Sequence, residues 1–145
     1  MNITDCITNA EAGKPFAQHQ LATRYSYGNG VELDLSLAVD WFYRAAIQGY
    51  APSQFRLGAF YQYGLGVEQD YIQAASWFQK AAEQGHADAQ NSLGICYLNG
   101  FGVERNPLLA MQWFEKSAAQ GNQCAQDNLA FHCEDEFYRF LYEPN

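Results

Sequence analysis

The chain has 145 residues, which is enough for one domain with a hydrophobic core. Hydrophobic residues make up 48% of it, so it does not have the composition of a disordered chain. Sixteen acidic residues against 8 Lys and Arg give a formal charge of −8, which disfavours nucleic-acid binding and would suit a basic protein partner.

The first residues, "MNITDCITNAEAGK", contain neither the basic nor the apolar stretch of a signal peptide. The sequence also lacks a run of 18 apolar residues, the length that a membrane-spanning helix would need. We therefore expect a cytoplasmic protein without a membrane partner. The cysteines, Cys6, Cys96, Cys124 and Cys133, form no C-x-x-C pair, and we expect free thiols that pack as small apolar groups.

A repeat of 36 residues is the main feature of the sequence. Trp41, Trp77 and Trp113 are separated by 77 − 41 = 36 and 113 − 77 = 36 residues. The same shift relates other triplets, among them Tyr25, Tyr61 and Tyr97, Gly28, Gly64 and Gly100, Gly30, Gly66 and Gly102, and Phe42, Phe78 and Phe114. Such a period is typical of a repeat protein. It defines three units at about 15–50, 51–86 and 87–122 within a single domain over 1–145.

Before the first complete unit, residues 1–14 resemble the end of another one. The letters "NAEAG" at 9–13 align with "AAEQG" at 81–85, which predicts the remnant of a preceding helix. Each complete unit then carries two helical segments, at about 51–63 and 71–84 in unit two, because their apolar residues recur at helical spacing.

The ends of the second helix in each unit carry capping signals. Asp70 is a predicted N-cap with Gln73 three residues later, and Asp34 and Asn106 hold the same place in the other units. Gly85 is predicted to end the second helix in a left-handed conformation.

In the first helix, Gly58 and its equivalents are predicted to allow close approach of a ring of the Trp77 type, because glycine is otherwise unfavourable there.

The last part of the chain departs from the repeat. Glu136 and Tyr138 stand where the two loop glycines would be, so a capping helix is predicted over 123–142, with Phe137, Phe140 and Leu141 covering the end of the stack. The alternative is that this aromatic tail docks a partner.

The stretch "SQFRLGAFYQYGLGVEQDYIQAASWFQKAAEQGHADAQ" resembles a Sel1-like repeat, a relative of the tetratricopeptide repeat. The resemblance covers about residues 15–130. It implies an all-α fold, a right-handed α/α superhelix (solenoid) of three helix-turn-helix repeats plus the C-terminal capping helix. It also implies an adaptor or scaffold, mostly without catalysis, that binds a protein or peptide in a concave groove lined by the first helices.

The loop "YGLGVEQD" at 63–70 has the appearance of a phosphate-binding loop. It recurs as "YGNGVELD" and "NGFGVERN", each time after a helix and without the Lys-Ser/Thr of a P-loop. We therefore expect these glycines to serve positive φ angles in a tight turn.

No catalytic, metal or cofactor site is predicted. His19, His86 and His132 fall at different register positions, and none has a zinc-site spacing such as H-E-x-x-H. A secreted, cysteine-rich branch of the Sel1 family has been associated with β-lactam binding or hydrolysis, but its regular cysteine pairs are missing here.

Function is expected at first-helix positions that vary between units. The predicted partner-binding residues are Arg24, Tyr27, Arg56, Phe60, Tyr63, Ser92, Asn99 and His132. Aromatic side chains would anchor a partner and arginines would bind carboxylates. For Phe60, packing against a neighbouring unit is an equally open alternative. Two other functions stay open: a stoichiometric inhibitor or immunity protein against a basic toxin, and an enzyme that handles β-lactams. The sequence does not define the oligomeric state.

Overall fold

The computed structural model describes residues 1–133, and in this range it has eight helices and no strand. The helices are α1 (Ile3–Glu11), α2 (Pro15–Tyr27), α3 (Leu35–Ala46), α4 (Ala51–Tyr63), α5 (Tyr71–Glu83), α6 (Ala87–Asn99), α7 (Pro107–Ala119) and α8 (Gln123–Cys133). The predicted capping helix over 123–142 is therefore described only as far as Cys133, and Phe137, Phe140 and Leu141 lie outside the described residues.

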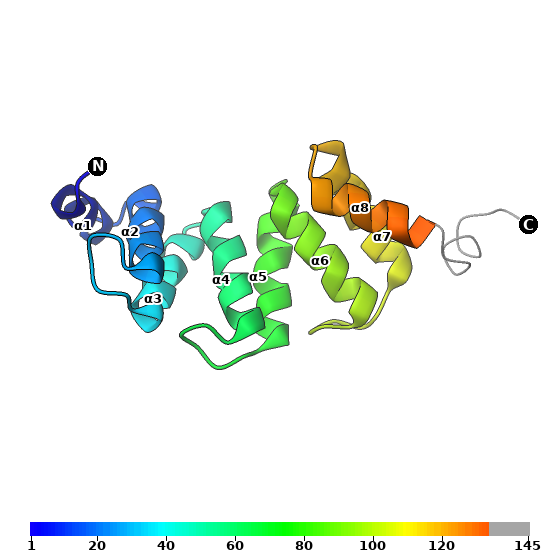
Figure 1. The fold of residues 1–145 in the computed structure, drawn as a ribbon, viewed down its shortest axis with the longest axis horizontal. Coiled ribbons are helices and arrows are strands. Elements are labelled where there is room, and N and C mark those ends of the chain that lie inside the picture. The colour runs from blue at the N-terminus through cyan, green and yellow to red at the C-terminus, as the bar shows by residue number, and fades with distance from the viewer. Residues whose placement is uncertain (134–145) are drawn as a thin grey trace, which may run out of the picture.

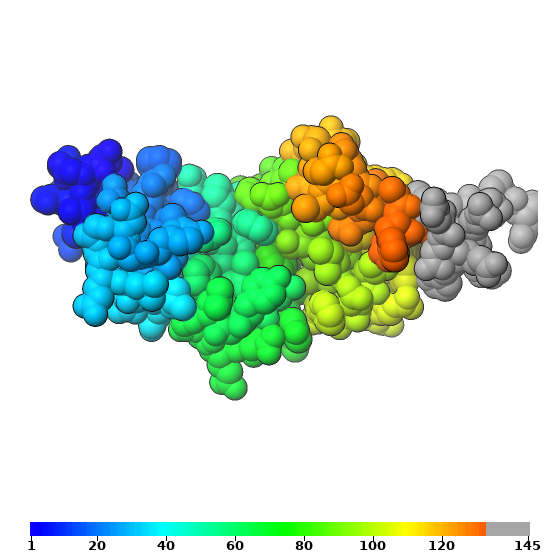
Figure 2. All heavy atoms as spheres, viewed as in Figure 1, coloured from blue at the N-terminus to red at the C-terminus, as the bar shows by residue number. Residues whose placement is uncertain are grey.

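The helices form an elongated stack in which chain order is spatial order. Each helix packs chiefly against the helix before it and the helix after it. Figure 1 shows the colours following one another from α1 at one end to α8 near the other, and Figure 2 shows that side chains fill the stack without a break between units. This arrangement is that of a solenoid, in which each unit contacts only its neighbours.

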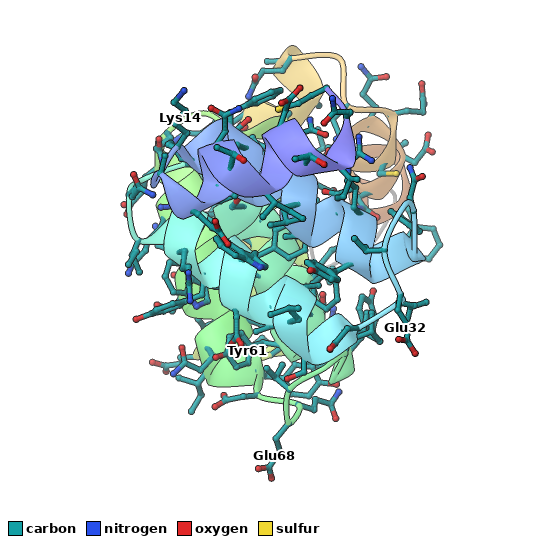
Figure 3. The ribbon with its side chains drawn as sticks, turned by 90° about the vertical axis from the view of Figure 1, so that its left-hand side faces the viewer. Lys14, Glu32, Tyr61 and Glu68 are labelled. Carbon is teal, nitrogen blue, oxygen red and sulfur yellow. The ribbon has the colours of Figure 1, made fainter. Side chains whose placement is uncertain are left out.

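Successive units are rotated about the long axis of the stack. Figure 3 looks along this axis from the N-terminal end, where Glu32 marks the loop of unit one on the right and Glu68 marks the loop of unit two at the bottom. The loops thus turn clockwise on moving away from the viewer, which is the sense of a right-handed superhelix.

The predicted helix ends are confirmed. The side chains of Asp34, Asp70 and Asn106 accept hydrogen bonds from backbone N–H groups at 3.0, 3.1 and 3.1 Å at the starts of α3, α5 and α7. The first loop glycines have positive φ and cap the first helices, for example Gly64 with φ of 66° after α4.

The core consists of columns of equivalent side chains. The largest fully buried ones are Phe42, Phe78, Phe114, Leu21, Leu57 and Leu93. The close approach predicted at Gly58 is confirmed, but the ring is that of Phe78 and not Trp77. A Cβ added at Gly58 would lie 2.7 Å from two carbons of the Phe78 ring. The correction follows from helix geometry, since adjacent residues of a helix point in different directions and Phe78 is the one aimed at α4.

Buried glutamines connect the units in the same way three times. Gln54 donates to the carbonyl of Ala46 at 3.1 Å and accepts from the amide of Gln84 at 2.8 Å. The pairs Gln18 with Gln48 and Gln90 with Gln120 repeat this bond at 2.8 and 2.9 Å. At each junction the amide thus adds a second hydrogen bond to a carbonyl at the end of the preceding helix, which also accepts one from the backbone N–H of a glycine, as Ala46 does from Gly49 at 3.0 Å.

The second loop glycine of units two and three packs against the backbone of the preceding unit, and we call this contact a joint. Gly66 has a φ of 66°, and a Cβ at this residue would lie 2.5 Å from the backbone C and O of Leu35 at the start of α3. Gly102 meets the backbone of Tyr71 at the start of α5 in the same way. The positive φ predicted for these loops is confirmed, and the structure adds a steric reason for glycine.

Candidate functional site

One face of the first helices carries polar and aromatic side chains that are exposed or only partly buried. We call it the first-helix face and define it by Gln20, Tyr27, Arg56, Tyr63, Ser92 and Asn99. The side chains of Tyr27 and Tyr63 are 69% and 68% exposed in the last turns of α2 and α4. Asn99 has the equivalent position in α6 and is also exposed. Large aromatic side chains with this exposure could bury much area against a partner.

Arg56 connects the two tyrosine-bearing units. Its guanidinium donates to the hydroxyl of Tyr27 across the boundary between α4 and α2, at 3.5 Å. It also lies 5.8 Å from the centre of the Phe42 ring and 5.9 Å from that of Phe60, where ring faces attract a cation. The rings thus hold the arginine in place, while most of its N–H donors are left for other acceptors.

Phe60 is not part of the accessible face. Its side chain is 4% exposed, and its ring centre lies 5.4 Å from that of Phe42 in the preceding unit. The prediction of Phe60 as an exposed aromatic anchor is therefore corrected, and packing against the neighbouring unit is what the structure shows. The physical reason is that this register position, shared with buried Cys96, points toward the preceding unit.

The remaining predicted residues lie apart from the centre of this face. Arg24 is partly exposed, and its guanidinium donates to the carbonyl of Met1 at 2.7 Å. Ser92 is partly exposed on α6, in the row that contains Arg56. His132 lies on α8, where its ring stacks edge-to-face against Phe131 with centres 4.9 Å apart. Arg56 and Tyr27 are thus the predicted residues that the structure brings into contact, and Tyr63 lies about two turns beyond Arg56 on the same helix.

A histidine and a serine, both outside the predicted set, meet at the same boundary. Nδ1 of His19 lies 2.8 Å from Oγ of Ser53, a distance found between a nucleophile and its base. Ser53 is completely buried, however, so a substrate cannot reach its hydroxyl. Burial, with contributions from Arg56 and His86, lowers the pKa of His19 to about 4, so the ring is neutral at pH 7. The pair therefore serves packing between units. Ser53 breaks a column of alanines, namely Ala17, Ala89 and Ala125, which is the sequence signal that could have revealed it.

Two apolar residues outside the predicted set are also exposed on first helices. Phe131 on α8 is 76% exposed, and Phe16 on α2 is 55% exposed. Neither position is apolar in every unit, since Asp88 is equivalent to Phe16 and Thr23 is equivalent to Phe131. The repeat pattern alone therefore gave no signal for them.

The loops do not have the chemistry of a phosphate site. A surface depression of about 630 Å³ lies between the loop of unit three and the start of α5. Its lining includes Asp70 and Glu104, whose negative charges would repel a phosphate. Asp70 is already occupied as the cap of α5.

Two of the three cysteines whose side chains are described are core residues. Cys6 and Cys96 are buried free thiols, and Cys124 is free and exposed. Burial raises the pKa of Cys96 to about 11 and raises that of Cys6 as well, so both remain unreactive thiols.

Within residues 1–133, no group of three or more His, Cys, Asp or Glu side chains could hold a metal ion. In the same range no helix has both the length and the apolar character needed to cross a bilayer.

The stack, the joints and the open first-helix face define the class of the protein as an α-solenoid of helix-turn-helix repeats. The Sel1 repeat model matches residues 15–50, 51–86 and 87–122, and the chain belongs to the Sel1 repeat family. Proteins of this family are typically protein–protein interaction modules and generally act as non-catalytic scaffolds.

Solved structures with similar folds come from several bacteria. The c5321 protein of uropathogenic Escherichia coli, a protective antigen that displays an SLR fold, is 41% identical with a TM-score of 0.88 over 91% of this chain. This chain spans only 28% of the length of that protein. A Sel1 repeat protein from Oxalobacter formigenes is 39% identical with a TM-score of 0.82, over 88% of this chain and 96% of that one.

A more distant similarity concerns the fold alone. The cysteine-rich protein B of Helicobacter pylori is 24% identical with a TM-score of 0.68, over 88% of this chain and 91% of that one. Among curated proteins no match was found.

Proposed function

We propose that this chain binds a protein or an extended peptide on the first-helix face, on the concave side of the solenoid. The observation that carries the proposal is the arrangement of Tyr27, Arg56 and Tyr63. Two tyrosines with most of their surface exposed lie on α2 and α4, and the guanidinium of Arg56 on α4 bonds the hydroxyl of Tyr27 and lies beside two phenylalanine rings. Tyrosine and arginine are the residue types that dominate the energy of protein interfaces.

The rigidity of the support favours binding. Arg56 and Tyr63 stand on α4, whose opposite side is fixed by the Phe78 ring at Gly58 and by the buried amide of Gln54. Side chains on a packed helix lose less conformational freedom on binding than side chains on a loop, which lowers the entropic cost of association. A face built on several parallel first helices also suits an extended ligand, because equivalent positions recur along the stack.

Affinity capture from the source cells tests this proposal. The bait is the wild-type chain, the double variant Arg56→Glu/Tyr63→Ala, or a control, Tyr43→Ala. Tyr43 is 48% exposed on α3, a second helix, so the control removes a comparable ring from a different face. We expect the double variant to lose the partners that the wild type and the control both retain. Equal recovery of every partner by all three baits would show that this face is not the binding surface.

A further inference from the structure

The carboxylates of units one and two are absent from their first helices. The first helices of units one and two, α2 and α4, contain Arg24 and Arg56 and not a single carboxylate. The carboxylates of these units lie on the second helices and on the loops: Glu32, Asp34, Asp40, Glu68, Asp70 and Glu83. A chain with a formal charge of −8 thus has a tyrosine-rich area without negative charge.

Arg56 is the centre of this area. Within residues 1–133, its contacts are the Tyr27 hydroxyl and the rings of Phe42 and Phe60, and no carboxylate pairs with it. The three cations on the second helices have a different environment. Arg44, Lys80 and Lys116 each lie over the tryptophan of their own helix, 4.4, 4.4 and 4.5 Å from the ring centre.

The area ends at unit three. In α6, Ser92 replaces the arginine and Asp88 introduces a carboxylate in the first turn, where it accepts a hydrogen bond from Asn122 at 2.8 Å. The cationic, tyrosine-lined surface is therefore restricted to the boundary of units one and two.

We infer that the first-helix face of units one and two binds an acidic peptide segment, with a carboxylate of the ligand on Arg56 and apolar neighbours of that carboxylate on Tyr27 and Tyr63. This inference rests on the proposed function and specifies its ligand. A guanidinium can bind a carboxylate through two parallel N–H···O bonds, and a tyrosine hydroxyl can donate a further one.

The total charge of the protein does not oppose this assignment. At an ionic strength of about 0.15 M the Debye length is about 8 Å, so carboxylates on the second helices are largely screened from a ligand on the other face. The charges close to the ligand then decide its preference. The net charge by itself would have suggested a basic partner, and the local distribution points to the opposite class.

Selection from a displayed library of random dodecapeptides tests the inference. Peptides recovered on the wild-type chain are sequenced, and the strongest are synthesised for affinity measurement by fluorescence anisotropy at 0.15 M salt. We expect enrichment of Asp and Glu over the starting library. We also expect Arg56→Gln to weaken binding about 10- to 100-fold, the range for a hydrogen bond to a charged group.

The matched control is Arg44→Gln, which makes the same chemical change on α3, and it should leave the affinity unchanged. Melting curves of each variant establish that it is folded. Recovery of neutral or basic peptides, recovery of none, or acidic peptides that bind Arg56→Gln as well as wild type would each overturn the inference.

A second variant separates this inference from the proposed function. If the recovered peptides are basic but Tyr63→Ala abolishes their binding, the first-helix face is the binding site and only the assignment of an acidic ligand is wrong. If the recovered peptides bind Tyr63→Ala like the wild type, the surface itself is misassigned.

Discussion

The joint formed by Gly66 offers a sharp test of how the units are held together. Replacement of Gly66 by alanine places a Cβ against the backbone of Leu35, 2.5 Å from its C and O atoms. The matched variant is Gly30→Ala, because Gly30 has the same loop position in unit one. There a Cβ would meet only the end of the Arg24 side chain at 3.4 Å and the Cβ of Ile3 at 4.0 Å.

The expected magnitudes follow from two separate terms. Both glycines have positive φ, 66° at Gly66 and 76° at Gly30, and alanine in this region costs about 1–2 kcal/mol. Gly30→Ala should lower the free energy of unfolding by this amount alone, because a flexible arginine can move aside. At Gly66 the start of α3 must shift, and overpacking of this kind adds about 1–3 kcal/mol. We therefore expect a loss of about 2–5 kcal/mol for Gly66→Ala.

The assay is urea unfolding at equilibrium, followed by far-ultraviolet circular dichroism, for the wild type and both variants. Unfolding free energies are compared only if the dependence on urea is the same in all three, since a changed slope would signal partial unfolding of the stack. Equal losses for Gly66→Ala and Gly30→Ala would refute the steric contact between units, because only the backbone conformation would then explain the glycine.

Three further outcomes are expected. Trp77→Ala should lower the free energy of unfolding by about 3–5 kcal/mol, since Trp77 is a large buried core ring, and an unchanged melting temperature would argue against a stacked core. Gln54→Leu should cost about 1–3 kcal/mol in urea unfolding because it removes two hydrogen bonds between units, each worth about 0.5–1.5 kcal/mol, and a neutral effect would count against this role of the glutamines. For His19, a pKa of about 4 in the folded chain against 6.5 when unfolded means that the unfolded state binds more protons between these values, so stability falls as the pH is lowered. With allowance for the partial exposure of the ring, the loss between pH 7.5 and 5.5 is about 1 kcal/mol. The variant His19→Gln should lose this part of the pH dependence, and an unchanged dependence would contradict the assignment.

The sequence was sufficient for everything that is local or repeated. Caps at Asp34, Asp70 and Asn106 and positive φ at the loop glycines depend on a few neighbouring residues, and the 36-residue period shows them three times. Helix order and antiparallel pairing follow from short connections between amphipathic segments.

The sequence was not sufficient for contacts between units. The period shows which residues are equivalent but not which neighbour each helix face meets. The sequence therefore pairs Gly58 with a ring of the Trp77 type, where the structure has Phe78, and it does not decide between core and surface for Phe60. The contact of His19 with Ser53 depends in the same way on how α2 and α4 are placed relative to each other.

The distribution of charged residues can be seen in the sequence, but it indicates a ligand class only when the fold shows which helices share a surface. The absence of carboxylates from α2 and α4 is visible in the letters of 15–27 and 51–63. Its meaning depends on the knowledge that Arg56 reaches the Tyr27 hydroxyl across the unit boundary, so that the two helices share one surface.

Photo-crosslinking tests the central claim, that the first-helix face binds the partner, most directly. A photoreactive phenylalanine analogue is introduced in place of Tyr63 on α4, or in place of Tyr43 on α3 as the control, and the partner obtained by affinity capture is irradiated with each protein. We predict a crosslinked product for position 63 and none for position 43. A product at position 43 with none at position 63 would contradict the claim and place the partner on the second helices.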